Sequence, residues 1–233
     1  ISIIENFYSV FGFKHRYVHA TKPNDALGTK QDCALAEKAL ANALTNTGIR
    51  YTIDKGEGAF YGPKIEVHIE DSQGRDWQLG TAQLDLVMLP KQFNIFYIDE
   101  QGEKQMPWVI HRAVFGSFER FIGILLEHFN GALPFWLSPT QVAILSMNEH
   151  TESYAKEITE KLKKEGVRAL LDDRNESLNK KIREAELQKI PYLLVVGERE
   201  AKEKTVSVRE RGKGDVGALT LEQFFAIIKK WID

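Results

Sequence analysis

A short segment rich in glycine and proline is the feature that most constrains how this chain of 233 residues can fold. Residues Gly131–Pro139 combine a glycine, two prolines and a serine around Trp136. Glycine and proline interrupt helices and strands, so this segment is the best position for a boundary between domains. We therefore predict two domains, residues 1–135 and residues 136–233, each within the usual size range for a domain.

Beyond the boundary, short apolar runs alternate with amphipathic stretches. Val142–Met147 and Pro191–Gly197 are apolar runs typical of buried strands, whereas residues 151–164 repeat their apolar positions at helical spacing. A further helix is expected over residues 221–232. Strands that alternate with helices favour an α/β domain with a mixed, largely parallel sheet.

The pattern before the boundary is different. A helix is expected over Gln31–Asn46 and another over Phe118–Phe129, and several strand-like runs joined by turns lie between them. Three of these runs cover residues 77–89, 93–99 and 106–112. Lys64–Glu70 alternates strictly between polar and apolar residues, and Asp71–Asp76 has the composition of a hairpin turn. The pattern predicts an α+β domain with an antiparallel sheet.

The charge balance and the cysteine content exclude some classes of protein. The chain has 31 Lys and Arg against 33 Asp and Glu, and a net charge of −2 is not that of a protein that coats nucleic acid. This charge is still compatible with a local patch that binds a structured RNA. The single cysteine, Cys33, excludes an internal disulfide, fits the reducing cytoplasm and is expected to be buried. No apolar run approaches the roughly 18 residues of a membrane span, so no membrane partner is expected.

The first candidate for chemistry is the segment Gly56–Lys64, which has three glycines and one proline. Backbone approaches a ligand most closely where Cβ atoms are missing. Tyr61 offers a ring and a hydroxyl, and Lys64 offers a cation. The pattern required for a phosphate-binding P-loop is absent. The alternative interpretation is an ordinary loop between strands with a solvated lysine.

The second candidate is Trp77–Asp85, which carries amide and hydroxyl side chains. Gln78 and Gln83 are five residues apart, so a regular strand would point them to opposite faces. Gly80 permits a β-bulge that would bring both to one side. Uncharged amide and hydroxyl side chains on one face of a strand, here called the polar floor, suit the binding of a small zwitterion or a ribose. The alternative is that they are ordinary polar residues on the solvent-exposed face of a sheet.

The third candidate is Ile110–Arg120. A single strand histidine such as His111 is more often structural than a metal ligand, because zinc takes three or four ligands. Ser117 is expected to cap the following helix, which puts Arg120 in its first turn, where the helix dipole disfavours a cation. Arg120 should therefore meet an anion, either a ligand phosphate or a carboxylate such as that of Glu119.

In this order and spacing, the three segments resemble bacterial-type threonyl-tRNA synthetases, a family of class II aminoacyl-tRNA synthetases, and residues 108–121 resemble class II motif 3. The resemblance implies that residues 1–135 are the C-terminal part of the class II catalytic domain and that residues 136–233 are an anticodon-binding domain. It also implies an aminoacyl-tRNA ligase that activates threonine with ATP and Mg²⁺ and transfers it to the 3′ end of threonine tRNA.

The resemblance further implies roles for single residues. Arg120 matches an arginine that contacts ATP, and Lys64 matches an active-site lysine. The residues that match positions in the threonine and adenylate pocket are Tyr61, Gln78, Thr81, Gln83 and Ser117. His111 matches a ligand of the family's Zn²⁺, which binds the amino group and hydroxyl of threonine. A site that requires a hydroxyl rejects valine better than an apolar pocket can.

Four residues of the second domain match positions that contact anticodon bases, namely Asn175, Lys189, Glu200 and Arg209. Unpaired bases in a loop can be recognised by such amide, carboxylate and guanidinium groups. A basic helix face formed by Lys180, Lys181 and Arg183 flanks them in sequence, and the alternative for this face is that it is simply solvated.

Some features of the family are missing from this sequence. Nothing resembles class II motif 1 or motif 2, only one zinc ligand is matched, and Cys33 stands where the family usually has a tryptophan. We therefore expect a fragment of a longer enzyme, inactive alone, whose full-length relatives are homodimers. Two alternatives stay open: a non-catalytic tRNA- or RNA-binding module that is a truncated paralogue, and a related prolyl or histidyl enzyme. The context of His111 argues against the second.

Overall fold

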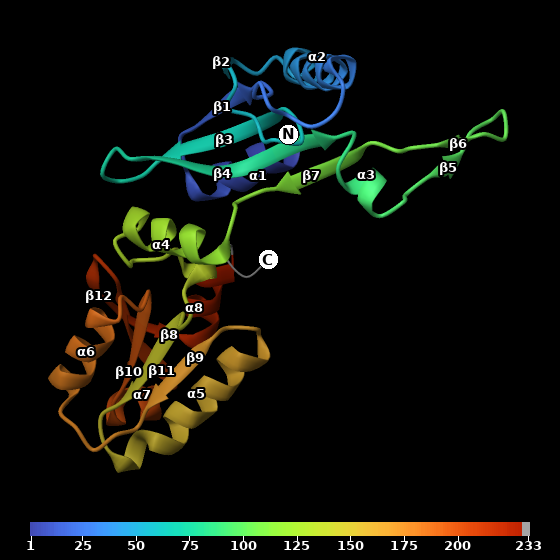
Figure 1. The fold of residues 1–233 in the computed structure, drawn as a ribbon. Helices are drawn as coiled ribbons and strands as arrows, with labels where there is room; N and C mark the ends of the chain where they lie inside the picture. Colours follow the sequence, from blue (N-terminus) through green and yellow to red (C-terminus); the bar gives the residue numbers. More distant parts are fainter. Residues whose placement is uncertain (230–233) are drawn as a thin grey trace. The chain divides into compact units, whose positions relative to one another are not determined.

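The computed structural model describes residues 1–229, and the chain divides into two compact units, Ile1–His128 and Phe129–Asp233 (Figure 1). Phe135, near which the sequence places the domain boundary, is buried in the core of the second unit. The boundary assigned to that position stays a prediction. Each unit has its own sheet of five strands, and each is described by itself below.

The first unit is a sheet with helices packed against it. Its elements are α1 (Ser2–Phe11), β1 (His15–Ala20), α2 (Lys30–Asn46), β2 (Tyr51–Asp54), β3 (Lys64–Glu70), β4 (Asp76–Asp85), α3 (Leu89–Gln92), β5 (Tyr97–Ile98), β6 (Lys104–Gln105), β7 (Val109–Ala113) and α4 (Phe118–His128). The strand order is β2-β1-β3-β4-β7. All pairs are antiparallel except β1 with β2, which α2 joins by a crossover, as a parallel pair requires.

The alternation along β3 separates the two faces of this sheet. Ile65, Val67 and Ile69 are at most 2% exposed and lie on the buried face. Lys64, Glu66 and His68 occupy the intervening positions, so they point to the other face. The strict sequence pattern over Lys64–Glu70 thus predicted both the strand and its two faces correctly.

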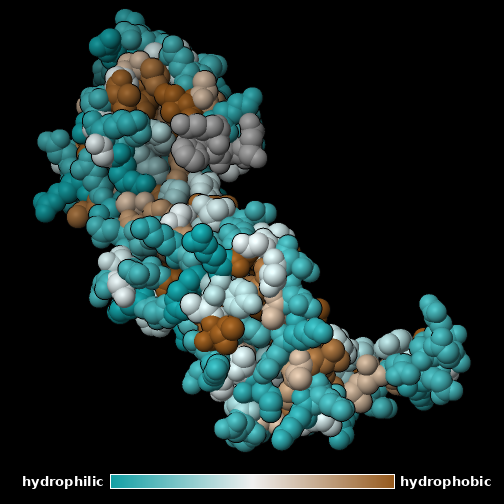
Figure 2. Space-filling view, turned by 90° about the horizontal axis from the view of Figure 1, so that it is seen from above, coloured by the Kyte–Doolittle hydropathy of each residue, from teal (hydrophilic) through white to brown (hydrophobic). Residues whose placement is uncertain are grey.

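Three strands expected from the sequence are shorter in the structure. The run expected to continue from Trp77 to Leu89 ends at Asp85, whose carboxylate accepts hydrogen bonds from the backbone N–H groups of Val87, Met88 and Leu89 and so starts α3. Only β5 remains of the run over residues 93–99, and only β7 of the run over residues 106–112. In Figure 2, the projecting tip of the β5–β6 hairpin is hydrophilic and its base is more hydrophobic.

Aromatic rings join α1 to α4. The Phe7 ring lies 5.3 Å from the rings of both Phe115 and Phe121, and the Phe11 ring also lies 5.3 Å from that of Phe121. Aromatic pairs at these separations add to the stability from area burial alone. This cluster fixes the helix whose first turn carries Arg120.

The second unit has helices on both faces of its sheet. Its elements are η1 (Phe135–Leu137), β8 (Val142–Ser146), η2 (Glu149–Thr151), α5 (Glu152–Lys164), β9 (Ala169–Asp172), α6 (Leu178–Leu187), β10 (Tyr192–Val196), α7 (Glu198–Glu203), β11 (Thr205–Glu210), β12 (Gly214–Thr220) and α8 (Leu221–Ile228). The order is β12-β11-β10-β8-β9. The three strands β9, β8 and β10 are parallel, while β11 and β12 join antiparallel, so the sheet is mixed as predicted.

Strand β8 is buried on both faces because helices cover each of them. Val142 and Ile144 pack in one apolar cluster with residues of α5 and α8, while Ala143 and Leu145 pack in another with residues of α6. Strands buried on both faces have continuous apolar sequences, which explains why this one was recognisable. The last residues of the helix expected over 221–232 lie outside the described residues. No helix within residues 1–229 is long and apolar enough to cross a bilayer.

Replacing Leu194 with alanine tests the core of the second unit. Leu194 is fully buried, so Leu194→Ala should lower the free energy of unfolding by about 2–5 kcal/mol through lost burial and a residual cavity. Leu187→Ala is the matched control, because Leu187 is 70% exposed and its loss should change the free energy by less than about 0.5 kcal/mol. Urea denaturation monitored by circular dichroism measures both. Equal effects of the two variants would contradict the assigned core.

Candidate functional site

Three candidate residues form one row across the first sheet. Strand β4 pairs with β3 and β7, and Gln83 stands opposite Lys64 on one side and His111 on the other. Residues directly opposite each other on neighbouring strands point to the same face, and the strands are about 4.8 Å apart. The row therefore places an ammonium, an amide and an imidazole side by side on the polar face of the sheet.

A β-bulge brings the second amide onto the same face. Val67 pairs with Gly80 and His68 pairs with Gln78, so Leu79 is skipped in the register. The bulge predicted from Gly80 is confirmed, and Gln78 Nε2 donates a hydrogen bond to Thr81 Oγ1 at 3.1 Å. The predicted floor of amides and hydroxyls thus forms on one face of β4.

The glycines of the Gly56–Lys64 loop allow close backbone packing. A Cβ atom on Gly62 would lie 2.5 Å from the carbonyl oxygen of Leu84, a distance that only glycine tolerates. Gln83 Nε2 donates to the carbonyl oxygen of Gly62 at 3.2 Å, which fastens the loop to the floor. As a result, the ring of Tyr61 lies 5.4 Å from the ring of His111.

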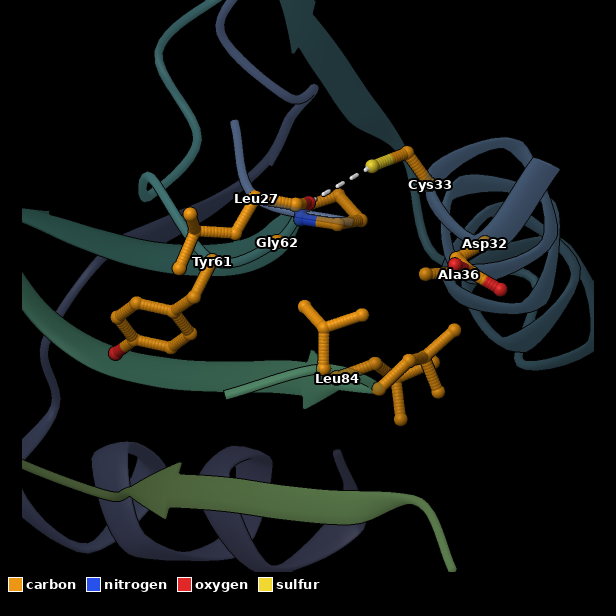
Figure 3. A pocket seen from close by; sticks show the side chains of 10 residues that line it. Leu27, Asp32, Cys33, Ala36, Tyr61, Gly62 and Leu84 are labelled. Carbon is orange, nitrogen blue, oxygen red and sulfur yellow. Dashed lines mark hydrogen bonds between the residues drawn. The ribbon is translucent and has the colours of Figure 1, made fainter. Parts of the chain in front are cut away.

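Cys33 lies behind this loop and has a structural role. It is 5% exposed, as the sequence predicted, and its thiol donates to the carbonyl oxygen of Leu27 at 3.6 Å (Figure 3). The cavity between Cys33, Ala36 and Leu84 measures only ≈ 10 Å³, about enough for one water molecule. In Figure 3 the Tyr61 ring points away from the centre of this cavity, and it lies beside the ring of His111.

A chain of charged groups holds Lys64. Its Nζ lies 2.6 Å from Glu66 Oε1, and the other oxygen of Glu66 lies 2.9 Å from His68 Nε2. Burial by itself would raise the pKa of Glu66, but the hydrogen bonds and charges of Lys64 and His68 hold it below its usual value. His68 Nδ1 lies in turn 2.6 Å from Asp76. Glu66 is therefore an ionised partner that fixes the lysine on the floor.

Arg120 is held at the end of the floor. Its backbone N–H donates to Ser117 Oγ at 3.3 Å, which confirms the predicted cap. Its Nη1 donates to the carbonyl oxygen of Gln78 at 3.1 Å, and its Cζ lies 5.5 Å from the ring centre of Trp77. Within residues 1–229 it forms no ion pair, so the alternative partner Glu119 is not used. The guanidinium stays available for an external anion.

The buried carboxylate of Asp85 holds the imidazole of His111 in one orientation. Its Nε2 lies 3.2 Å from Asp85 Oδ2, and the Asp85 carboxylate is fully buried. Burial alone would raise the pKa of Asp85, but backbone N–H groups from Val87 to Leu89 and the imidazole lower it. Among the described residues no group of three or more His, Cys, Asp and Glu side chains is placed to hold a metal. These residues do not by themselves fit a zinc ion.

In the second unit, Lys189 and Arg209 line one cavity, whereas Glu200 contacts strand β11 at Ser207, outside that cavity. Glu200 accepts hydrogen bonds from Gly197 N–H at 3.0 Å and from Ser207 Oγ at 2.9 Å. Arg209 lies two residues after Ser207 and therefore on the same face. Arg209 and Lys189 line one cavity of ≈ 300 Å³, and the buried Nε of Arg209 has no hydrogen-bond partner within residues 1–229.

Asn175 lies in the exposed loop between β9 and α6. Beneath that loop, the buried Lys181 Nζ donates to the carbonyl oxygens of Ser146 and Asp172, which end β8 and β9. Glu200 follows the end of β10, so Asn175 and Glu200 share the carboxyl edge of the parallel strands. No hydrogen bond or ion pair joins Asn175 to the cavity of Arg209 in the described part of the chain.

Several residues of the first site were missed by sequence reasoning. Glu66 and His68 share the face of Lys64 through the alternation of β3, and Asp85 shares the face of Gln83 through that of β4. Counting every second residue from each candidate would have found all three. The contribution of Trp77 had no such signal, because its contact with Arg120 depends on the position of α4.

Two models of known protein families match most of the chain. A model of the tRNA synthetase class II core domain (G, H, P, S and T) matches residues 1–129, and a model of the anticodon binding domain matches residues 141–231. The chain therefore belongs to the class II tRNA synthetase family. Within that family its curated relatives are threonine–tRNA ligases, to which it is similar along its whole length.

The ligase of Clostridium tetani is 47% identical over 233 residues and that of Acetivibrio thermocellus is 52% identical over 224 residues. The chain spans about a third of the length of these relatives, 36% and 35% respectively. Among solved structures, the RNA binding domain of threonyl-tRNA synthetase from Cryptosporidium parvum has a TM-score of 0.89 and 40% identity, with 99% of this chain and 58% of that chain covered. A putative threonyl-tRNA synthetase from Aeropyrum pernix has a TM-score of 0.73 and 26% identity, with 98% and 59% covered.

Replacing Gly62 with alanine tests the contact between loop and floor. The added Cβ would meet the Leu84 carbonyl at 2.5 Å, so Gly62→Ala should force the backbone apart and lower the free energy of unfolding of the first unit. Gly123→Ala is the control, because Gly123 lies inside α4 with no atom within 4 Å of the added Cβ, and alanine there should stabilise by about 0.5–1 kcal/mol. Urea denaturation gives both values, and a stabilising Gly62→Ala would contradict the packing.

Proposed function

We propose that this chain is part of a threonine–tRNA ligase, in which the first unit supplies part of the ATP and threonine site and the second unit binds the anticodon of threonine tRNA. The observation that supports this most strongly is the row of Lys64, Gln83 and His111 on one sheet face. Arg120 contacts the same strand, β4, five residues before Gln83, at the carbonyl oxygen of Gln78. Cations beside a neutral polar floor suit an aminoacyl nucleotide, because the cations can pair with its phosphate while amide and hydroxyl groups can pair with its ribose hydroxyls and its α-ammonium group.

The proposed reaction has two steps. The threonine carboxylate attacks the α-phosphate of ATP, pyrophosphate leaves with its Mg²⁺, and threonyl-adenylate forms. The 3′-terminal ribose hydroxyl of the tRNA then attacks the threonyl carbonyl and AMP leaves. Arg120 and Lys64 would stabilise negative charge on phosphate oxygens during the first step, as preorganised cations do.

The neutral side chains would position the substrates. The proposed binding groups for threonine and the adenylate are Tyr61, Gln78, Thr81, Gln83 and Ser117. Amide and hydroxyl groups that must be paired when the substrate is bound reject analogues that lack a matching polar group. His111 would contribute one zinc ligand at most, and the other ligands would have to lie outside the described residues.

In the second unit, the cavity beside β11 is proposed as the anticodon site. A guanidinium with a buried, unpaired Nε is costly, and a base edge in the cavity would supply its acceptor. Asn175, Lys189, Glu200 and Arg209 are the proposed base contacts. The proposal also includes the domain boundary near Phe135 and a homodimeric full-length enzyme. It further includes a cytoplasmic location, which is supported by the single cysteine, Cys33, being a free thiol.

A second candidate function is an RNA-binding module without catalysis. It is favoured by one observation, since the solved RNA binding domain from Cryptosporidium parvum covers 99% of this chain. Both candidates share the anticodon site and differ in whether the floor of the first unit binds nucleotide. Binding of ATP to the chain, measured by calorimetry and lost in Arg120→Ala, would favour the ligase over the module.

Replacing Arg209 with alanine tests the proposed anticodon site. Loss of a guanidinium that contacts a base should weaken binding of the threonine tRNA anticodon stem-loop by about 1–3 kcal/mol. The measurement is a fluorescence titration of the labelled stem-loop with the 233-residue chain.

Lys163→Ala is the matched control for that titration. Lys163 lies on α5, which packs on the opposite face of the sheet from α6, so its removal should leave affinity nearly unchanged. A stem-loop with an altered anticodon should bind the wild-type chain weakly and should lose its dependence on Arg209. Equal losses for Arg209→Ala and Lys163→Ala would place the RNA elsewhere.

The isolated chain should neither bind zinc tightly nor activate threonine. His111 is a single candidate ligand, whereas zinc requires three or four, so wild type and His111→Ala should contain the same small amount of zinc after dialysis. Atomic absorption measures the metal, and threonine-dependent exchange of pyrophosphate into ATP measures activation. Stoichiometric zinc that is lost in His111→Ala, or robust exchange, would contradict this prediction.

A further inference from the structure

The position of Arg120 needs an explanation, because little in its own helix supports it. Arg120 is exposed and lies in the first turn of α4, where the helix dipole disfavours a positive charge. A long exposed side chain is disordered unless specific contacts hold it. The only such contacts from the described residues are the carbonyl oxygen of Gln78 and the ring of Trp77.

Trp77 is itself fixed by a buried carboxylate. Its indole Nε1–H donates to Asp71 Oδ2 at 2.8 Å, and the side chain of Asp71 has no exposed surface. Asp71 also accepts hydrogen bonds from the backbone N–H groups of Gln73 and Arg75 at 2.9 Å. Burial would raise the pKa of Asp71, but these hydrogen bonds hold it well below its usual value, so the acceptor stays ionised.

The same carboxylate also ties the hairpin to α4. Arg75 Nε donates to Asp71 at 2.6 Å, and Arg75 Nη2 donates to Glu127 in α4 at 2.7 Å. Glu127 lies seven residues after Arg120, about two helical turns further along. The β3–β4 hairpin therefore contacts α4 at two points, through Trp77 near its start and through Arg75 near its end.

We propose that Trp77, locked in place by Asp71, is the positioning residue for Arg120. The indole face attracts the guanidinium, and the carbonyl oxygen of Gln78 takes one of its five N–H groups. The remaining N–H groups are then directed to the end of the amide floor, ready for the polyphosphate of a nucleotide. The inference rests on the proposed nucleotide site, and it adds a residue that acts through Arg120 without touching the substrate.

The first experiment observes Arg120 directly and needs no ligand. In the 233-residue chain labelled with ¹⁵N-arginine, the side-chain Hε resonance of Arg120 should be displaced from the position of a free arginine by the ring current of Trp77. The resonance is assigned by its absence in Arg120→Lys. The displacement should disappear in Trp77→Leu, shrink in Trp77→Phe and persist in Trp108→Leu, a control at a half-exposed tryptophan outside the site.

The second experiment measures the consequence for binding, with sodium tripolyphosphate and ATP as probes. Loss of an exposed cation–π contact should weaken binding by about 2- to 5-fold in Trp77→Leu, with Trp77→Phe between Trp77→Leu and wild type. The double variant Trp77→Leu/Arg120→Ala should bind no more weakly than Arg120→Ala, because Trp77 acts only through Arg120. Trp108→Leu should bind as the wild type does.

The two readouts separate this inference from the function on which it rests. A wild-type Arg120 resonance at the free-arginine position overturns the positioning role, even if the Trp77 variants fail to fold. A displaced resonance in a chain that binds neither probe supports the positioning contact and contradicts nucleotide binding by this chain. A double variant that binds more weakly than Arg120→Ala also overturns the inference, since Trp77 would then act on its own.

Discussion

The pairing of β4 with β3 and β7 is the interaction on which the first unit depends. It decides which side chains stand next to each other, because the hydrogen-bond register sets Lys64, Gln83 and His111 in one row. Everything else at the site is attached to that row. The glycine loop is hydrogen-bonded to that row through Gln83, and α4 contacts the same strand, β4, through the backbone of Gln78. The register of β4 with its two neighbours therefore determines which functional groups lie side by side on the polar floor.

Buried charged groups fix the loops around both sheets. In the first unit, Asp71 and Asp85 each accept several backbone hydrogen bonds where a strand ends, so each carboxylate converts a strand end into a defined turn. In the second unit the charge has the opposite sign: the ammonium of Lys181 donates hydrogen bonds to the carbonyl oxygens of Ser146 and Asp172 at the ends of β8 and β9. A buried charge that loses its hydrogen-bond partners costs several kcal/mol, so each of these charged groups holds its turn in one conformation.

Local patterns in the sequence predicted the regular elements well. The alternation of Lys64–Glu70 and the apolar runs around Val142 and Tyr192 gave the correct strands, and Gly80 gave the bulge. Strand ends were predicted less well, since the end of β4 depends on the Asp85 carboxylate and not on hydropathy. Contacts such as Arg120 with Trp77 join residues 43 positions apart, so no local pattern contains them.

The skipped residue in β4 links the length of this strand to its recognition surface. Gln78 and Gln83 are five positions apart, and because Leu79 is unpaired their spacing along the ladder is four, which puts both side chains on one face. If all ten residues of β4 paired without that irregularity, Gln83 and Asp85 would rotate into the apolar layer. Gly80 also meets a second demand at the same place, because an added Cβ would lie 3.0 Å from the carbonyl oxygen of Val114 and 3.0 Å from Val67 Cβ. The shape of the recognition surface therefore depends on one residue without a side chain.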